Sequence, residues 1–116
     1  MKMMMRGLIL LMIVGVVAGC SKKCNNEAPR ARILNNGTMA ASVQIKTSDG
    51  STVNINNVAP GTASAYASYA AGEITFTITV DKVPYVKVVA AGNCFQYDIA
   101  IDANNAITVA ASDRNS

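Results

Sequence analysis

Hydrophobic and polar residues alternate along most of the chain after residue 30, and a period of two predicts β-strands. The clearest example covers residues 73–80, where Ile74, Phe76 and Ile78 point to one side and threonines point to the other. Such a segment is typical of an antiparallel strand with one face in the core and one in water. No helical period appears after the first 20 residues, so we expect an all-β domain.

Turn-forming residues separate the alternating segments at regular intervals. Gly50, Gly61 and Gly72 recur every 11 residues, which is the turn spacing of a β-sandwich. We therefore expect a single antiparallel Ig-like or transthyretin-like β-sandwich of seven or eight strands over about residues 30–111, in a domain that covers residues 30–116. The expected core residues are Val43, Ile45, Val53, Ile74, Phe76, Ile78, Phe95, Tyr97, Ile99 and Ile107.

A continuous uncharged segment precedes this domain. It covers residues 7–21, follows the basic residues Lys2 and Arg6, and ends in small side chains. Its 15 residues are fewer than the roughly 20 that a membrane-spanning helix needs. A basic start followed by a short apolar run is typical of a secretory signal, so we expect a signal helix over residues 1–19 that is cleaved from the mature protein.

The signal ends in Val-Ala-Gly-Cys at residues 17–20, which resembles the lipobox of bacterial lipoproteins. The resemblance implies that the Cys20 thiol carries a diacylglycerol and that the chain is cleaved just before it, leaving residues 20–29 as a lipidated tether to the membrane. The alternative is an ordinary signal peptide with a cysteine near its end. Ser21 resembles the outer-membrane class of these proteins, which implies a lipid-anchored envelope protein that faces the periplasm.

Two further cysteines remain once Cys20 is acylated. An exported protein folds in an oxidising compartment, which favours a disulfide between Cys24 and Cys94. A free Cys24 on a mobile tether and an intermolecular bridge are the alternatives.

The charge distribution argues against nucleic acid as a partner. The net charge of +3 arises near the N-terminus, because after Arg32 acidic residues outnumber basic ones. The basic residues there are Lys46, Lys82, Lys87 and Arg114, and the acidic residues are Asp49, Glu73, Asp81, Asp98, Asp102 and Asp113. A nucleic-acid surface needs a cluster of basic residues on the folded domain, which this distribution does not supply.

Catalytic and metal-binding chemistry is poorly represented. The sequence contains no histidine, so neither a Ser/His/Asp nor a Cys/His arrangement can form. Asp98 and Asp102 could form a carboxylate pair, but we expect solvated surface acids. Asp102, Asn104 and Asn105 could help to bind calcium, although the glycine and distal glutamate of an EF-hand loop are absent. We therefore expect no enzyme, no metal and no cofactor.

Tyr66 and Tyr69 are the closely spaced aromatic residues that could stack on a sugar. Residues three apart on a strand point to opposite faces, so we expect Tyr69 in the core and Tyr66 on the surface as a candidate ligand contact.

Several short segments resemble a domain-of-unknown-function family of exported and lipid-anchored bacterial proteins. They are Ala31-Arg32-Ile33-Leu34-Asn35, Val43-x-Ile45 before Asp49-Gly50, Asn57-Val58-x-x-Gly61-x-x-Ser64-x-Tyr66, and Ala71-Gly72-x-x-Thr75-x-Thr77-Ile78. The resemblance covers roughly residues 31–80 and implies a β-sandwich without established catalytic residues. The aspartate-rich, proline-containing segment that usually follows the first strand is replaced here by residues 37–41.

Together these features favour a lipid-anchored, non-catalytic envelope protein that acts as a structural or protein-interaction module, with an envelope protein as its partner. The alternative is a carbohydrate-binding module on the outer envelope. The expected contact surfaces are the Tyr66 face and the turns at Asp49-Gly50 and residues 102–106.

Overall fold

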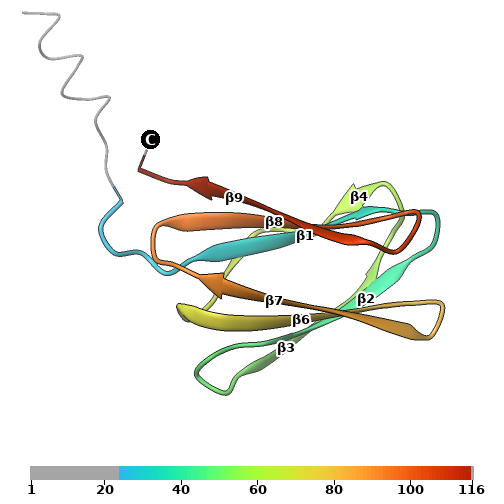
Figure 1. Cartoon of the computed structure of the whole chain (residues 1–116), viewed down its shortest axis with the longest axis horizontal. Helices are drawn as coiled ribbons and strands as arrows, with labels where there is room; N and C mark the ends of the chain where they lie inside the picture. Colours follow the sequence, from blue (N-terminus) through green and yellow to red (C-terminus); the bar gives the residue numbers. More distant parts are fainter. Residues whose placement is uncertain (1–23, 116) are drawn as a thin grey trace, which may run out of the picture.

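The computed structural model describes residues 24–115, and these residues form two β-sheets that pack face to face (Figure 1). The expected all-β sandwich is confirmed. Within the described residues no helix is long and apolar enough to cross a membrane. The described strands are β1 (Arg30–Asn36), β2 (Ala41–Lys46), β3 (Thr52–Val58), β4 (Thr62–Ala63), β5 (Ala67–Ser68), β6 (Gly72–Val80), β7 (Val83–Ala91), β8 (Phe95–Asp102) and β9 (Ile107–Asp113).

One sheet has the order β4-β1-β8-β9, with the two-residue strand β5 also paired to β1, and the other has the order β3-β2-β6-β7. All pairs are antiparallel except β1 and β8, which run parallel from Arg30↔Gln96 to Asn36↔Asp102. A hairpin forces its strands to be antiparallel, but the connection from β1 to β8 passes through the opposite sheet and imposes no such constraint. This pair therefore differs from the antiparallel pairing that we expected.

The core lies between the two sheets and contains most of the residues that the alternation predicts. Seven of the ten expected core residues are buried, namely Val43, Ile45, Ile74, Phe76, Ile78, Tyr97 and Ile99, and Ile107 is half-buried against them. Tyr69 is also buried, as expected, with 8% of its surface exposed.

For two residues the prediction of a core position is wrong. Val53 is 38% exposed because β3 is the edge strand of its sheet. Phe95 is 36% exposed because it is the first residue of β8, beside the turn at residues 92–94, at the end of the sandwich. The Phe95 ring still stacks on Tyr97, with 6.3 Å between the ring centroids.

We expected residues 20–29 to be a tether. The part that the structure describes, residues 24–29, is bonded to the sandwich. A disulfide joins Cys24 to Cys94 in the turn between β7 and β8. The Cys94 amide donates to the Glu27 carbonyl at 2.9 Å, and the Glu27 carboxylate pairs with Arg114 at 2.6 Å. Pro29 is fully buried. The expected lipid site, Cys20, and the expected signal over residues 1–19 lie outside the described residues.

Candidate functional site

The two ends of the sandwich carry different elements. The disulfide, the start of β1 and the described C-terminal residues lie at one end, which we call the anchor end (Figure 1). The connections at residues 37–40, 81–82 and 103–106 lie at the opposite end, the distal end, because β1, β7 and β8 each run from one end to the other. Nine strand residues such as those of β7 span about 30 Å, which separates the two ends.

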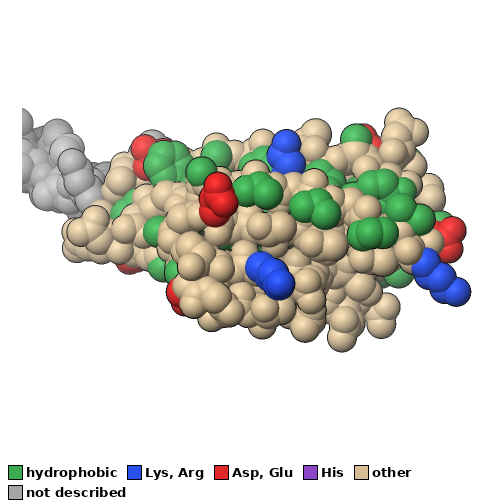
Figure 2. Space-filling view, turned by 60° about the horizontal axis from the view of Figure 1, so that its bottom comes forward, with side chains coloured by type: hydrophobic (Ala, Val, Ile, Leu, Met, Phe, Trp, Pro, Cys, Tyr) green, Lys and Arg blue, Asp and Glu red, His purple; other side chains and the backbone are tan. Residues whose placement is uncertain are grey.

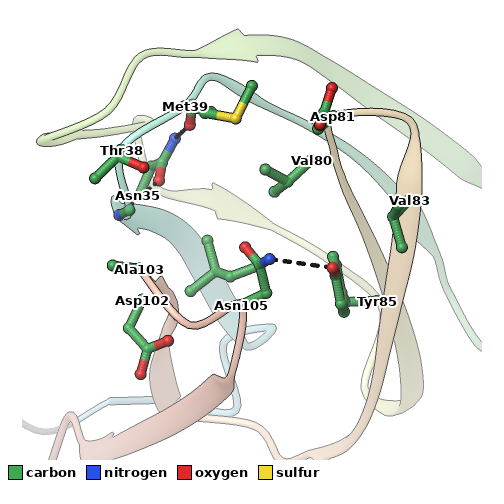
Figure 3. Close-up of a pocket in the computed structure, with 12 residues that line it drawn as sticks. Asn35, Thr38, Met39, Val80, Asp81, Val83, Tyr85, Asp102, Ala103 and Asn105 are labelled. Carbon is green, nitrogen blue, oxygen red and sulfur yellow. Dashed lines mark hydrogen bonds between the residues drawn. The ribbon is translucent and has the colours of Figure 1, made fainter.

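A cavity of about 180 Å³ opens at the distal end (Figure 3). Three connections and the strands beside them supply its walls, namely Asn35, Gly37, Thr38, Met39, Val80, Asp81, Val83, Tyr85, Ile101, Asp102, Ala103 and Asn105. Hydrophobic side chains gather at this end beside charged ones (Figure 2), and Met39 and Val83 are each 47% exposed. Loops at the end of a rigid sandwich are a common place for binding residues.

Asn35 shapes one wall of the cavity from inside the protein. Its side chain is 1% exposed, and its amide nitrogen donates to the carbonyls of Met39 at 2.8 Å and Val58 at 2.9 Å. Its side-chain oxygen accepts from the Gly37 amide at 2.9 Å. Two of these hydrogen bonds therefore hold the connection between β1 and β2 over the cavity, and the third ties Asn35 to the end of β3.

The adjoining wall is the turn between β8 and β9, because β1 and β8 are neighbours in one sheet. The Asp102 carboxylate accepts from the backbone amides of Asn104 at 2.8 Å and Ala106 at 3.0 Å, which closes the turn. Asn105 has φ of 62°, a left-handed conformation that asparagine tolerates. Its side-chain nitrogen donates to the Tyr85 hydroxyl at 3.1 Å (Figure 3). A polar pair from two different sheets thus lines the cavity.

The charge at the cavity is negative. Asp81 and Asp102 are among the lining residues, whereas no lysine or arginine is. The remaining wall is largely apolar and comes from the exposed Met39 and Val83 and the buried Val80 and Ile101. The arrangement suits a small polar, uncharged or cationic group that also has an apolar face.

Tyr66, the expected ligand contact, lies elsewhere and is engaged by its neighbours. Its hydroxyl donates to Asp98 at 2.7 Å, and the guanidinium groups of Arg30 and Arg32 lie 5.1 and 4.7 Å from its ring centroid. Asp98 also pairs with Arg32 at 2.9 and 3.2 Å, and Arg30 donates to Gln96 at 3.1 and 2.9 Å. These side chains form a closed network, the tyrosine cluster, on the outer face of the β1–β8 sheet near the anchor end.

The tyrosine cluster changes the acidity of its members. The hydrogen bond from Arg32 is the main reason why the pKa of Asp98 lies below its ordinary value, and the Tyr66 hydroxyl adds to the effect. Conversely, the hydrogen bond to Asp98 raises the pKa of Tyr66. The carboxylate is therefore held ionised and the phenol neutral, which is the state expected of a structural network.

The carboxylate pair that the sequence offered does not assemble. Asp98 belongs to the tyrosine cluster, while Asp102 closes a turn at the distal end, and their offset of four positions along β8 places their backbones about 13 Å apart. Among the described residues no group of three or more potential metal ligands comes together. The turn at residues 102–106, one of the contact surfaces that the sequence suggested, does supply part of the cavity lining, including Asn105. Sequence reasoning missed Asn35 and Tyr85 as site residues, because isolated polar residues in strands have no pattern that marks a cavity.

Comparisons with known proteins support the fold alone. No protein-family description matches the chain, and no curated protein does. Among solved structures, the chain is similar to the NMR structure of a protein from Eubacterium rectale, with a TM-score of 0.53 and 16% sequence identity over 72% of this chain and 87% of the other. The TM-score indicates a similar fold, and at 16% identity the likeness carries no further inference.

Proposed function

We propose that this protein is a lipid-anchored, non-catalytic module of the bacterial cell envelope that binds another envelope component at its distal end. The carrying observation is the position of the cavity, at the end of the sandwich opposite the Cys24–Cys94 disulfide. In the proposal, a diacylglycerol on Cys20 holds the protein at the outer membrane, facing the periplasm.

The geometry of the anchor supports this arrangement. Cys24 follows Cys20 by four residues, a reach of at most about 14 Å. Because Cys24 is joined to Cys94 and Glu27 to Arg114, the anchor end of the sandwich stays close to the bilayer. The cavity is then about 30 Å farther out and open to the surroundings.

The non-catalytic part of the proposal rests on the residues available. The sequence has no histidine, and the partly buried carboxylate of Asp98 already accepts from Arg32 and Tyr66. The cavity contains carboxylates but no nucleophile held beside a base.

Photo-crosslinking in intact cells tests the proposal. A photoreactive residue at Ala103, in the distal turn, is expected to crosslink the full-length lipoprotein to an envelope component. The matched control is Asp49, an exposed residue in the turn at the anchor end. Equal crosslinking from both positions, or crosslinking from Asp49 alone, contradicts a distal binding site.

Metabolic labelling tests the anchor separately. Cys20→Ala is expected to abolish incorporation of palmitate, whereas Cys24→Ala is expected to retain it, because only the lipobox cysteine is acylated. Persistent label on the Cys20→Ala protein contradicts the lipid anchor.

A further inference from the structure

The structure points to a chemical class for the ligand of the distal cavity: we infer that it binds one neutral sugar unit of an envelope glycan. This inference rests on the proposed function, since it concerns the same site, and goes beyond it by naming what the cavity recognises. Four properties of the cavity carry it, namely its hydrogen-bonding groups, its size, its charge and its apolar wall.

The polar pair of Tyr85 and Asn105 leaves one donor and one acceptor for a ligand. The Asn105 nitrogen donates to the Tyr85 oxygen, so the tyrosine hydroxyl keeps its own proton to donate and the Asn105 side-chain oxygen remains an acceptor. If the Asn105 amide is turned over, the tyrosine donates to it, and again one acceptor and one donor remain. Vicinal sugar hydroxyls each donate and accept, and therefore match such a pair in either orientation.

The volume limits the ligand to one ring. At about 30 Å³ for each water in the liquid, the 180 Å³ cavity corresponds to roughly six water molecules. Sites for drug-sized ligands are larger, about 300 to 1,000 Å³. A single pyranose ring fills a space of this order, and the rest of a glycan chain would extend from the open mouth into solvent.

Charge and polarity select among sugars. Asp81 and Asp102 are among the lining residues and no lysine or arginine is, so the net negative charge of the lining disfavours the carboxylates and phosphates of acidic sugars. The exposed apolar side chains of Met39 and Val83 offer contact to the C–H face of a sugar ring. A neutral sugar therefore fits better than an anionic one.

The tyrosine cluster is a weaker candidate for the same ligand. The Tyr66 ring is covered by two arginines and its hydroxyl is bonded to Asp98, so a sugar would have to displace contacts that the protein already makes. Tyr66 is for this reason the natural control residue, since removing its hydroxyl is the same chemical change at a different place.

The test is binding of the full-length lipoprotein, in lipid nanodiscs, to an array of neutral and acidic glycans, followed by titration of the best neutral glycan. We expect saturable binding that Tyr85→Phe weakens about tenfold, because one hydrogen bond to the ligand is lost. Asn105→Gly provides a second variant, since glycine accepts the φ of 62° at this position without strain. Tyr66→Phe is expected to bind like the unmodified protein.

Three outcomes overturn the inference: no binding to any neutral glycan, preference for acidic glycans, or equal weakening by Tyr85→Phe and Tyr66→Phe. Crosslinking from Ala103 to a protein, without glycan binding, refutes the sugar ligand and leaves the distal binding site standing. Crosslinking confined to the anchor end refutes the distal site itself.

Discussion

Asn35 shows how one buried side chain can decide the shape of a cavity wall. Two of its hydrogen bonds fix the connection between β1 and β2 over the cavity, and the third joins it to Val58 in β3. Replacement by alanine leaves two carbonyls and one amide without their partner, each worth about 1 kcal/mol. We expect Asn35→Ala to lower the free energy of unfolding by about 3 kcal/mol in urea titrations.

Asn36→Ala is the matched control for Asn35→Ala. Asn36 is the next residue in β1, and its side chain is exposed. We expect a change below about 0.5 kcal/mol for this variant. Similar losses for the two variants would contradict a special role for the Asn35 amide.

Asp98 makes the stability of the protein depend on pH. Its pKa is lowered in the folded protein, chiefly by Arg32, from an ordinary value of 3.8. The ionised carboxylate is thus favoured by folding, so its contribution is present above pH 3.8 and is lost as the pH falls through the lower, folded-state pKa. We expect the unfolding free energy to decrease over this acidic range, and to decrease less in Asp98→Asn.

Urea titrations between about pH 2 and pH 6 measure this difference. Asp49, whose pKa is lowered mainly by the Thr47 hydroxyl, contributes in the same direction but is present in both proteins and cancels in the comparison. Parallel pH profiles for the unmodified protein and Asp98→Asn would contradict the assignment.

At the scale of the elements, the turn between β6 and β7 combines tight geometry with unfavourable residues. Asp81 and Lys82 have φ of 50° and 68°, and Val80 pairs directly with Val83, so this is a two-residue hairpin in which both turn residues are left-handed. Glycine adopts that conformation at least cost. We expect Lys82→Gly to increase the free energy of unfolding by up to about 1 kcal/mol. The thermal unfolding midpoint should rise accordingly.

Lys87→Gly is the control for the turn variant, because Lys87 lies within β7, where glycine weakens a strand. It is expected to lower the midpoint. A lower midpoint for Lys82→Gly as well would mean that the lysine side chain matters more than the backbone conformation.

The sequence predicts the strands well where alternation is regular and fails where the backbone departs from it. β6 follows its pattern over all nine residues. In β3 the register shifts between Ala41 and Val43 of the partner strand, and Asn57 has φ of 59°. This bulge turns Val58 into the core, where it is 6% exposed, against the simple period of two.

The pairing of strands and the cavity are beyond what local pattern can predict. The parallel pair β1 and β8 joins residues about 66 positions apart, and only this pairing brings Asn35 beside the turn that contains Asn105. Alternation specifies which face of a strand is buried but not its neighbour in the sheet. Tyr66 could be predicted as a surface residue, but its arginine and aspartate partners come from strands that only the folded sheet places next to it.

At the scale of the molecule, the covalent and ionic links of the N-terminal segment are separated from the cavity. The disulfide and the Glu27–Arg114 ion pair lie at the anchor end, and the cavity lies at the distal end about 30 Å away. Changes at one end are therefore expected to leave the other intact as long as the domain remains folded.

The disulfide provides the sharpest test of this separation. Cys24 and Cys94 are 70 residues apart, and closing a loop of that length restricts the unfolded chain by about 4 kcal/mol in the chain-entropy model. We expect the double variant Cys24→Ser, Cys94→Ser to lose about that much unfolding free energy in urea titrations, and reducing agent to destabilise the unmodified protein but not the variant. Cys20→Ser, which keeps the disulfide, is the control.

At temperatures where the double variant is still folded, its distal end should crosslink and bind like that of the unmodified protein, because no cavity residue contacts the removed bond. Loss of binding by the folded double variant would show that the two ends are coupled.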